Sequence, residues 1–206
     1  MKKIFPILLT TIFLAALVFG CTPKEDPLAL TLINGDQMVG LRMSDLRTLP
    51  QMQGFGGVQR STGTVTSRAV YRVVSLNDIL PKIHTGSEAV SIQVEAEDGY
   101  AITFNSNQVK NGAFLAYDPQ TGSEIRTEDL NAILAYEMDG KPLNIEKDGL
   151  LRLVIVSPKD TQVTDGHWWV KKVSKIIIKP LLTEWILTLE GTLSEAMDRA
   201  TFESGM

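Results

Sequence analysis

The sequence is poor in the side chains that most often bind metal ions or act as nucleophiles. It has one cysteine, Cys21, and two histidines, His84 and His167, which lie far apart in the chain. A disulfide needs a second cysteine, and a zinc site needs three or four ligands at short spacings. The sequence therefore predicts no disulfide, no metal site and no histidine-based catalytic site.

Signatures of several other functions are missing as well. The chain has no G-x-S-x-G, P-loop or G-x-G-x-x-G motif, and we assign no catalytic residue. It is acidic, because 20 lysines and arginines against 24 aspartates and glutamates give a net charge of −4. An acidic chain without a basic stripe lacks the electrostatic footprint of a nucleic-acid-binding protein. We therefore expect no nucleic-acid partner.

The N-terminal segment has the pattern of a secretory signal. Two lysines precede the apolar run Ile4–Phe19, and the run leads into Cys21 as LVFGC. This ending resembles the lipobox of bacterial lipoproteins, in which the cysteine is lipidated and becomes the new N-terminus. We expect a signal peptide at residues 1–20, a lipidated Cys21 with a tether over residues 21–27, and an extracytoplasmic domain anchored by lipid to a bacterial membrane. The alternative is an uncleaved anchor, but the run is short against the ~17–25 residues of a membrane-spanning helix.

The remaining chain alternates apolar and polar residues in short runs, the pattern of β-strands. Asn-Gly and Asp-Gly pairs at residues 34, 98 and 139 favour tight turns between such strands. Two serines precede apolar-periodic segments and can cap short helices. We expect short helices at Ser44–Leu49, Ser75–Ile83 and near Trp169. We expect strands at Leu28–Ile33, Gln37–Leu41, Thr62–Val70, Ala89–Ala96, Tyr100–Phe104, Ile133–Met138, Leu150–Val156 and Ile176–Ile178.

The segment Gln51–Arg72 contains a glycine cluster. Gly54, Gly56 and Gly57 predict a flexible or tightly turning loop, because glycine is unfavourable inside strands. No capped helix follows this cluster, so a phosphate-binding loop is not expected.

Three runs in order resemble the oxidoreductase molybdopterin-binding domain, the fold of sulfite oxidase-like proteins. They are LAYEMDGKPL from Leu134, GLLRLVI from Gly149 and WVKKVSKI from Trp169. The opening from Leu28 resembles the family's LxLxG…dLxxLP start, and SLNDIL from Ser75 resembles its GVxLxdLL segment. The resemblance covers residues 28–180. It implies one α+β domain, dominated by a mixed, sandwich-like β-sheet with short helices.

The resemblance also implies a molybdenum centre with a cysteine thiolate on the metal and basic groups around the pterin phosphate. In the family the cysteine lies before the GVxLxdLL segment, where this chain has GVQRSTG over Gly57–Gly63 and no sulfur. Arg60 and Ser61 in this run are candidate cofactor-binding residues, and a serine oxygen can in principle ligate molybdenum. The second family signature is His-Gly-x-Pro-x-Arg, where this chain has KDGLLR ending at Arg152.

Two basic residues complete the candidate site. Arg152 could hold an anion bidentately or pair with a carboxylate of the protein itself. Lys171 matches a family position near the pterin, with a solvated surface lysine as the alternative. With the thiolate missing, we expect no cofactor, molybdopterin being the one that the resemblance implies.

Residues 181–206 resemble the opening of a second copy of the domain. Leu187–Gly191, LTLEG, resembles LTLING at Leu30–Gly35. A lone strand cannot pair its own backbone, so we expect Trp185–Leu189 to pair with the sheet of the same domain or with a neighbouring molecule.

The sequence thus predicts a membrane-anchored binding or accessory module without catalysis. Its pocket is expected near Arg152, Lys171 and the Gly54–Ser61 segment, for an anionic small molecule or a partner. One alternative is a genuine molybdopterin-dependent oxidoreductase with a non-cysteine metal ligand. Another is an interaction protein that recruits a partner through its C-terminal strand by β-augmentation.

Overall fold

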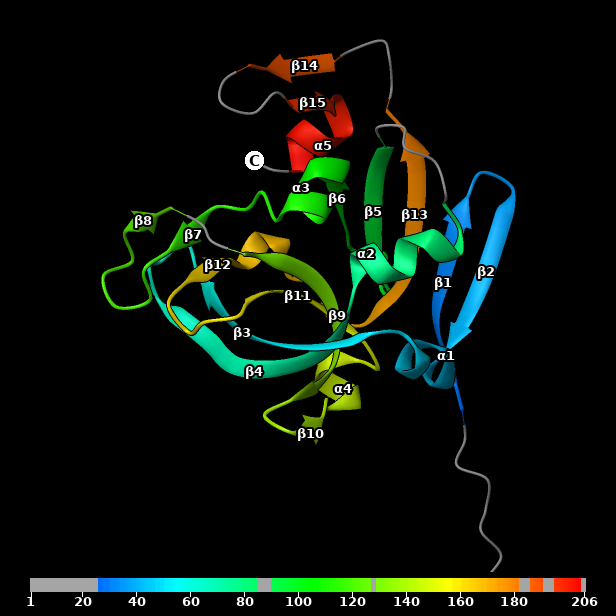
Figure 1. Ribbon diagram of the computed structural model, residues 1–206, viewed down its shortest axis with the longest axis horizontal. Helices are drawn as coiled ribbons and strands as arrows, with labels where there is room; N and C mark the ends of the chain where they lie inside the picture. The colour runs from blue at the N-terminus through cyan, green and yellow to red at the C-terminus, as the bar shows by residue number, and fades with distance from the viewer. Residues whose placement is uncertain (1–25, 85–89, 127–128, 182–185, 191–194, 205–206) are drawn as a thin grey trace, which may run out of the picture.

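The computed structural model describes residues 26–84, 90–126, 129–181, 186–190 and 195–204. They form two large β-sheets, a separate two-stranded sheet and short helices (Figure 1). Within these ranges, no helix combines the length and the apolar character needed to span a membrane. The mixed sheets with short helices make an α+β, sandwich-like fold, which confirms the fold class expected from the sequence.

The bounds of the elements are as follows. The strands are β1 Leu28–Asn34, β2 Gln37–Arg42, β3 Gln51–Gln59, β4 Val65–Ser75, β5 Val90–Ala96, β6 Ala101–Asn105, β7 Ala116–Tyr117, β8 Glu124–Ile125, β9 Asn131–Met138, β10 Lys141–Pro142, β11 Arg152–Ser157, β12 Val163–Asp165, β13 Val173–Pro180, β14 Ile186–Leu189 and β15 Glu195–Asp198. The helices are α1 Met43–Thr48, α2 Leu76–Ile79, α3 Ser106–Asn111, α4 Ile145–Asp148 and α5 Arg199–Ser204, with 3₁₀ turns η1 Leu80–Lys82 and η2 Gly166–Trp168.

The first sheet has the strand order β2-β1-β13-β5-β6. Its central pair, β1 with β13, is parallel, and the other pairs are antiparallel. The hairpin turns fall at the predicted Asn-Gly and Asp-Gly pairs, where Gly35 and Gly99 have positive φ. The sheet therefore joins the two ends of the domain, because β1 and β13 come from opposite ends of residues 28–180.

Four strands of the second sheet close on themselves. β3 pairs with β4, β4 with β9, β9 with β11, and β11 again with β3, all antiparallel. The other strands, β12, β7, β8 and β10, extend this ring at its edges. Closure gives each ring strand a neighbour on both sides over part of its length, with the β11–β3 contact limited to Val156 and Ser157 of β11.

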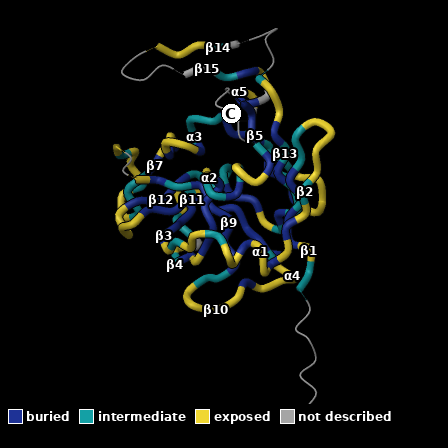
Figure 2. Tube along the Cα trace, turned by 45° about the vertical axis from the view of Figure 1, so that its right-hand side comes forward, coloured by how far each residue is buried: buried dark blue, intermediate teal, exposed yellow. Residues whose placement is uncertain are grey.

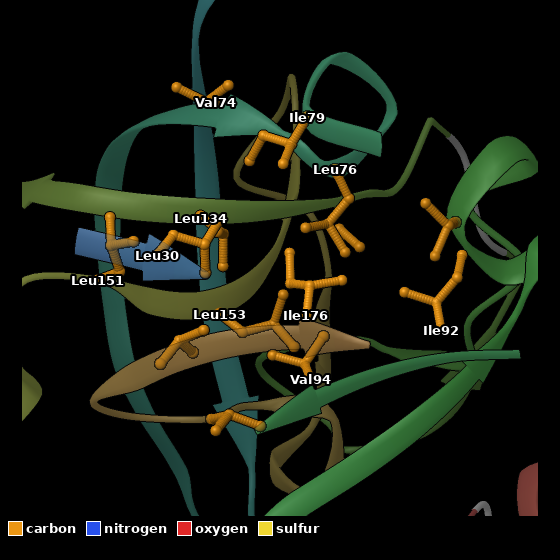
Figure 3. Packing of buried hydrophobic residues seen from close by; sticks show 14 of the residues in the cluster. Leu30, Val74, Leu76, Ile79, Ile92, Val94, Leu134, Leu151, Leu153 and Ile176 are labelled. Atoms are coloured by element: carbon orange, nitrogen blue, oxygen red, sulfur yellow. The ribbon is translucent and has the colours of Figure 1, made fainter. Parts of the chain in front are cut away.

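Side-chain alternation along the ring strands divides the core into two clusters. One face of the ring strands, including Val73, Ala135 and Val154, packs with Trp169 inside the ring. The opposite face, including Val74, Leu134 and Leu153, packs against the five-stranded sheet (Figure 3). Figure 2 shows buried residues along β9, β11, β5 and β13. The near-continuous apolar runs of β9 and β11 follow from burial on both faces.

The glycine-rich segment is a strand and not a loop, which corrects the sequence-based expectation. A Cβ on Gly54 would lie 2.7 Å from Val156 Cγ2, and one on Gly57 would lie 2.6 Å from Val163 Cγ1. A Cβ on Gly56 would lie 3.0 Å from Trp169. The glycines therefore allow neighbouring chains to approach β3 closely, a role that depends on partners far away in the sequence.

The expected short helices are present, with one change at a helix start. Ser75 caps α2 by accepting a hydrogen bond from the Asn77 backbone N–H at 3.1 Å. Ser44 lies inside α1 instead of capping it, and its hydroxyl donates to Asp26 Oδ2 at 2.6 Å. The Asp45 carboxylate accepts from the Arg42 backbone N–H at 2.7 Å and takes over the start of the helix.

The C-terminal segment forms its own strand–strand–helix unit. β14 pairs with β15 and not with the five-stranded sheet, which corrects one of the two pairings expected for the tail. β14, β15 and α5 repeat the order of β1, β2 and α1, in line with the sequence echo. The unit is tied to β5, since the buried Asp198 accepts a hydrogen bond from the Ser91 hydroxyl at 2.8 Å.

Candidate functional site

A groove of about 660 Å³ opens between α1, the Asp26–Pro27 segment before β1 and the β10–α4 segment. This volume falls within the ~300–1,000 Å³ typical of small-molecule sites in proteins. Figure 1 shows α1, β10 and α4 at the end of the molecule where β1 begins, opposite β14 and α5. The groove is lined by Asp26, Pro27, Met43, Ser44, Arg47, Tyr136, Pro142, Leu143, Ile145, Gly149 and Leu150.

Most of the groove wall is apolar. Its few polar groups differ in whether they already form hydrogen bonds or ion pairs within the protein. Asp26 accepts from both the hydroxyl and the backbone N–H of Ser44, and these bonds hold the pKa of the Asp26 carboxyl below its usual value. The Tyr136 hydroxyl donates to Gln51. The Arg47 guanidinium lies over the Tyr136 ring, 5.8 Å from its centroid, and no described carboxylate forms an ion pair with it. Arg47 is thus an available cation in the groove.

Beside the groove, Asp148 joins the two predicted basic residues. Its Oδ1 accepts from Arg152 Nη1 at 3.2 Å and lies 3.1 Å from Lys171 Nζ. The Asp148 and Arg152 side chains are 10% and 8% exposed, whereas Lys171 is 53% exposed. Of the two roles considered for Arg152, the structure shows the pairing with a carboxylate.

Arg152 closes one end of the ring interior. Its guanidinium carbon lies 5.2 Å from the centroid of the Trp169 ring, and Trp169 meets Tyr71 edge-on with centroids 5.7 Å apart. Burial raises the pKa of Tyr71 to about 12, while the nearby Arg152 opposes this shift. The Arg152 Nε is buried without a hydrogen-bond partner. The side chain is therefore held by the aromatic ring and Asp148, with no bidentate carboxylate pair.

The other two candidate residues lie elsewhere. Arg60 and Ser61 are exposed in the turn of the β3–β4 hairpin, where the Arg60 backbone N–H donates to Thr64 O at 3.0 Å. No hydrogen bond or ion pair described for the structure joins them to Arg152 or Lys171. The structure thus brings together two of the four predicted cofactor-binding residues. Cys21, the predicted lipidation site, and Trp185, the first residue of the predicted pairing strand, lie outside the described residues.

The residues present do not fit a sulfite oxidase-type molybdenum centre. The metal prefers a soft thiolate ligand, and the chain's one cysteine is Cys21, which lies outside the described residues. Ser61 is in an exposed turn, and Arg152 is already committed to Asp148. Across the described ranges, no group of three or more His, Cys, Asp and Glu residues is placed to hold a metal ion.

Comparison with known proteins supports the fold. The chain matches no family model and no curated protein sequence. Among solved structures it is similar to the sulfane dehydrogenase SoxCD from Paracoccus pantotrophus, with a TM-score of 0.53 and 17% identity. The match covers 76% of this chain and 39% of that one, so this chain spans well under half of SoxCD. The likeness supports a distant molybdopterin-domain-like fold.

The sequence pointed to the charge cluster but not to the groove. Arg47 and Tyr136 lie in runs that carry the family resemblance, but neither run marks them as binding residues, and they meet Ile145 only because α1 packs near β9 and α4. The one signal in the sequence was the position of Ile145, an apolar residue directly after the cap Asn144. The structure shows that this side chain is 65% exposed. Gly149 and Leu150 link the groove to Arg152, so both features share the α4–β11 connection.

Proposed function

We propose that the protein is an extracytoplasmic binding module, anchored by lipid at Cys21, that uses the molybdopterin-domain-like fold without its redox chemistry. The observation that carries this proposal is the groove, a largely apolar depression with one available cation, Arg47. Sites of this composition bind small organic ligands, because apolar walls supply affinity and few polar groups supply orientation. The pairing of Arg152 with Asp148 argues separately against a pterin phosphate at that position.

The absence of redox chemistry is tested by analysing the full chain after expression in a bacterial host that makes molybdopterin. We expect molybdenum by mass spectrometry and released pterin by fluorescence at background level, equal to that of an Arg152→Ala variant. Stoichiometric molybdenum with pterin in the wild-type chain would overturn the proposal in favour of a genuine oxidoreductase with a non-cysteine ligand. That alternative is supported by the fold likeness alone.

The anchor is tested by the Cys21→Ser variant in the same host. Because the serine cannot accept the thioether-linked lipid, we expect the variant to lose the acyl modification that mass spectrometry should find on residue 21 of the wild-type chain. A wild-type chain found in the membrane with residues 1–20 still attached and Cys21 unmodified would show an uncleaved N-terminal anchor instead of lipidation.

A further inference from the structure

The apolar members of the groove come from three elements and leave one side chain largely uncovered. Met43 of α1, Leu143 and Leu150 line it with Ile145, which is 65% exposed. Covering such apolar surface is favourable by roughly 25 cal/mol per Å². A contiguous apolar depression of this kind marks a binding site for an apolar partner.

The polar groups select the sign of charge that such a ligand would carry. Asp26, Ser44, Arg47 and Tyr136 are the charged or hydroxyl-bearing groups of the wall. The Asp26 carboxylate is satisfied by Ser44, and the Tyr136 hydroxyl is bonded to Gln51. The Asp26 carboxylate keeps its negative charge and also attracts Arg47 at longer range. Arg47 is still the charged group of the wall with no ion pair or hydrogen bond among the described residues, so an anionic group of a ligand can pair with it.

The position of the groove relative to the predicted anchor identifies the source of the ligand. The groove wall begins at Asp26, five residues after Cys21. Five residues span at most about 18 Å, at roughly 3.6 Å per extended residue. A chain lipidated at Cys21 therefore holds the groove close to the bilayer surface. Figures 1 and 2 both place β14 and β15 at the opposite end of the molecule.

From these observations we infer that the groove binds the acyl chain of an anionic lipid of the membrane that carries the anchor. The acyl chain lies against Met43, Leu143 and Ile145, and the anionic headgroup meets Arg47. This inference names the ligand class of the proposed binding module and rests on its lipid anchor.

The test uses the full lipidated chain in phosphatidylcholine vesicles that contain phosphatidylglycerol with a photoactivatable diazirine in one acyl chain. After illumination and digestion, the labelled peptides are identified by mass spectrometry. We expect the label in the peptides that carry Met43 and Leu143–Leu150. Ile145→Glu places a charge in the groove and should lower this labelling at least tenfold.

The matched control is Met38→Glu, the same kind of change at a 69% exposed apolar residue on β2, which does not line the groove. Because both side chains are exposed, both variants should fold, and Met38→Glu should leave the labelling unchanged. Arg47→Gln should reduce labelling by the phosphatidylglycerol probe more than by a phosphatidylcholine probe with the same diazirine chain. Equal losses with the two probes would overturn the role of the anionic headgroup.

The remaining outcomes separate this inference from the proposed function. If the chain floats with the vesicles but the label spreads evenly, or ignores Ile145→Glu, the inference fails and the anchor stands. If the chain does not float with them, the anchor and the inference both fail. If the probe labels the groove only in the Cys21→Ser variant, the protein's own lipid fills the groove, and the inference fails.

Discussion

Arg152 donates a hydrogen bond to Asp148 over 3.2 Å, and both side chains are about nine-tenths buried where α4 passes into β11. Lys171, half exposed, lies on the same carboxylate oxygen. Arg152, which could have bound an anionic ligand, instead forms an ion pair within the protein. The pair fixes the α4–β11 connection, which also forms part of the groove wall.

Removal of the acidic partner should be costly. Asp148→Ala leaves the Arg152 guanidinium buried and uncompensated, and breaking a buried pair in this way costs about 3–5 kcal/mol. The double variant Asp148→Ala, Arg152→Leu should recover most of this loss, because no buried charge remains. Urea unfolding of the three proteins measures both effects. A loss below about 1 kcal/mol in Asp148→Ala would show that solvent and the Trp169 ring already compensate the Arg152 charge.

The glycines of β3 should be intolerant of a methyl group. Gly57→Ala places a Cβ 2.6 Å from Val163 Cγ1 and 2.9 Å from Arg68 Cγ, and overpacking of this kind costs about 1–3 kcal/mol. Arg68 is a flexible, partly exposed side chain, so Val163 is the main obstacle.

Val163→Ala removes the conflicting methyl group and gives the matching test. In a double-mutant cycle, Gly57→Ala should cost less in the Val163→Ala background than in the wild type. Strictly additive losses would mean that the strand tolerates Cβ there and that another cause explains the glycine.

Stability should fall at high pH through Tyr71. Burial raises the pKa of Tyr71 to about 12 from 10.0, so the unfolded chain loses its phenolic proton first and unfolding becomes easier as the pH rises. The contribution is complete below pH 10 and is lost between pH 10 and about 12, with two pKa units corresponding to about 2.7 kcal/mol.

Lysines also titrate in this range, so the comparison is with Tyr71→Phe. The wild type should lose about 2–3 kcal/mol more than this variant between pH 10 and 12, measured by chemical denaturation at each pH. Parallel curves for the two proteins would contradict the burial of an ionisable phenol at this position.

Removal of one buried carboxylate, that of Asp198, should loosen the C-terminal unit. Asp198 accepts from the Thr201 backbone N–H at 2.9 Å and from Ser91, which couples the cap of α5 to β5. Asp198→Ala should cost about 1–2 kcal/mol through the lost cap. Amide hydrogen exchange over residues 195–204 should then accelerate roughly tenfold per 1.4 kcal/mol, with β9 and β11 unchanged.

Glu203→Ala is the control for this experiment. It removes the ion pair with Arg199, whose side chain is 72% exposed. Exposed pairs contribute little, about 0–1 kcal/mol. Equal acceleration in the two variants would show that α5 is not held by the Ser91–Asp198 contact.

Local patterns in the sequence determined most of the element positions. Period-2 alternation and Asn-Gly or Asp-Gly turns placed β1, β2, β5, β6 and β9 within a residue or two of their bounds, and Ser75 capped α2 as predicted. These features depend on neighbours along the chain, so a single sequence is enough to locate them. The mixed α+β class was what the family resemblance implied.

Tertiary structure decided what each element faces. The glycines at positions 54, 56 and 57 indicate a loop by composition, and only the approach of Val156, Val163 and Trp169 makes them part of a strand. Arg152 had two compatible roles until Asp148 was placed beside it. The groove joins residues from Asp26 to Leu150 that no single motif brings together. Periodicity reports that a face is buried, but the partner that covers it is set by contacts between distant parts of the chain.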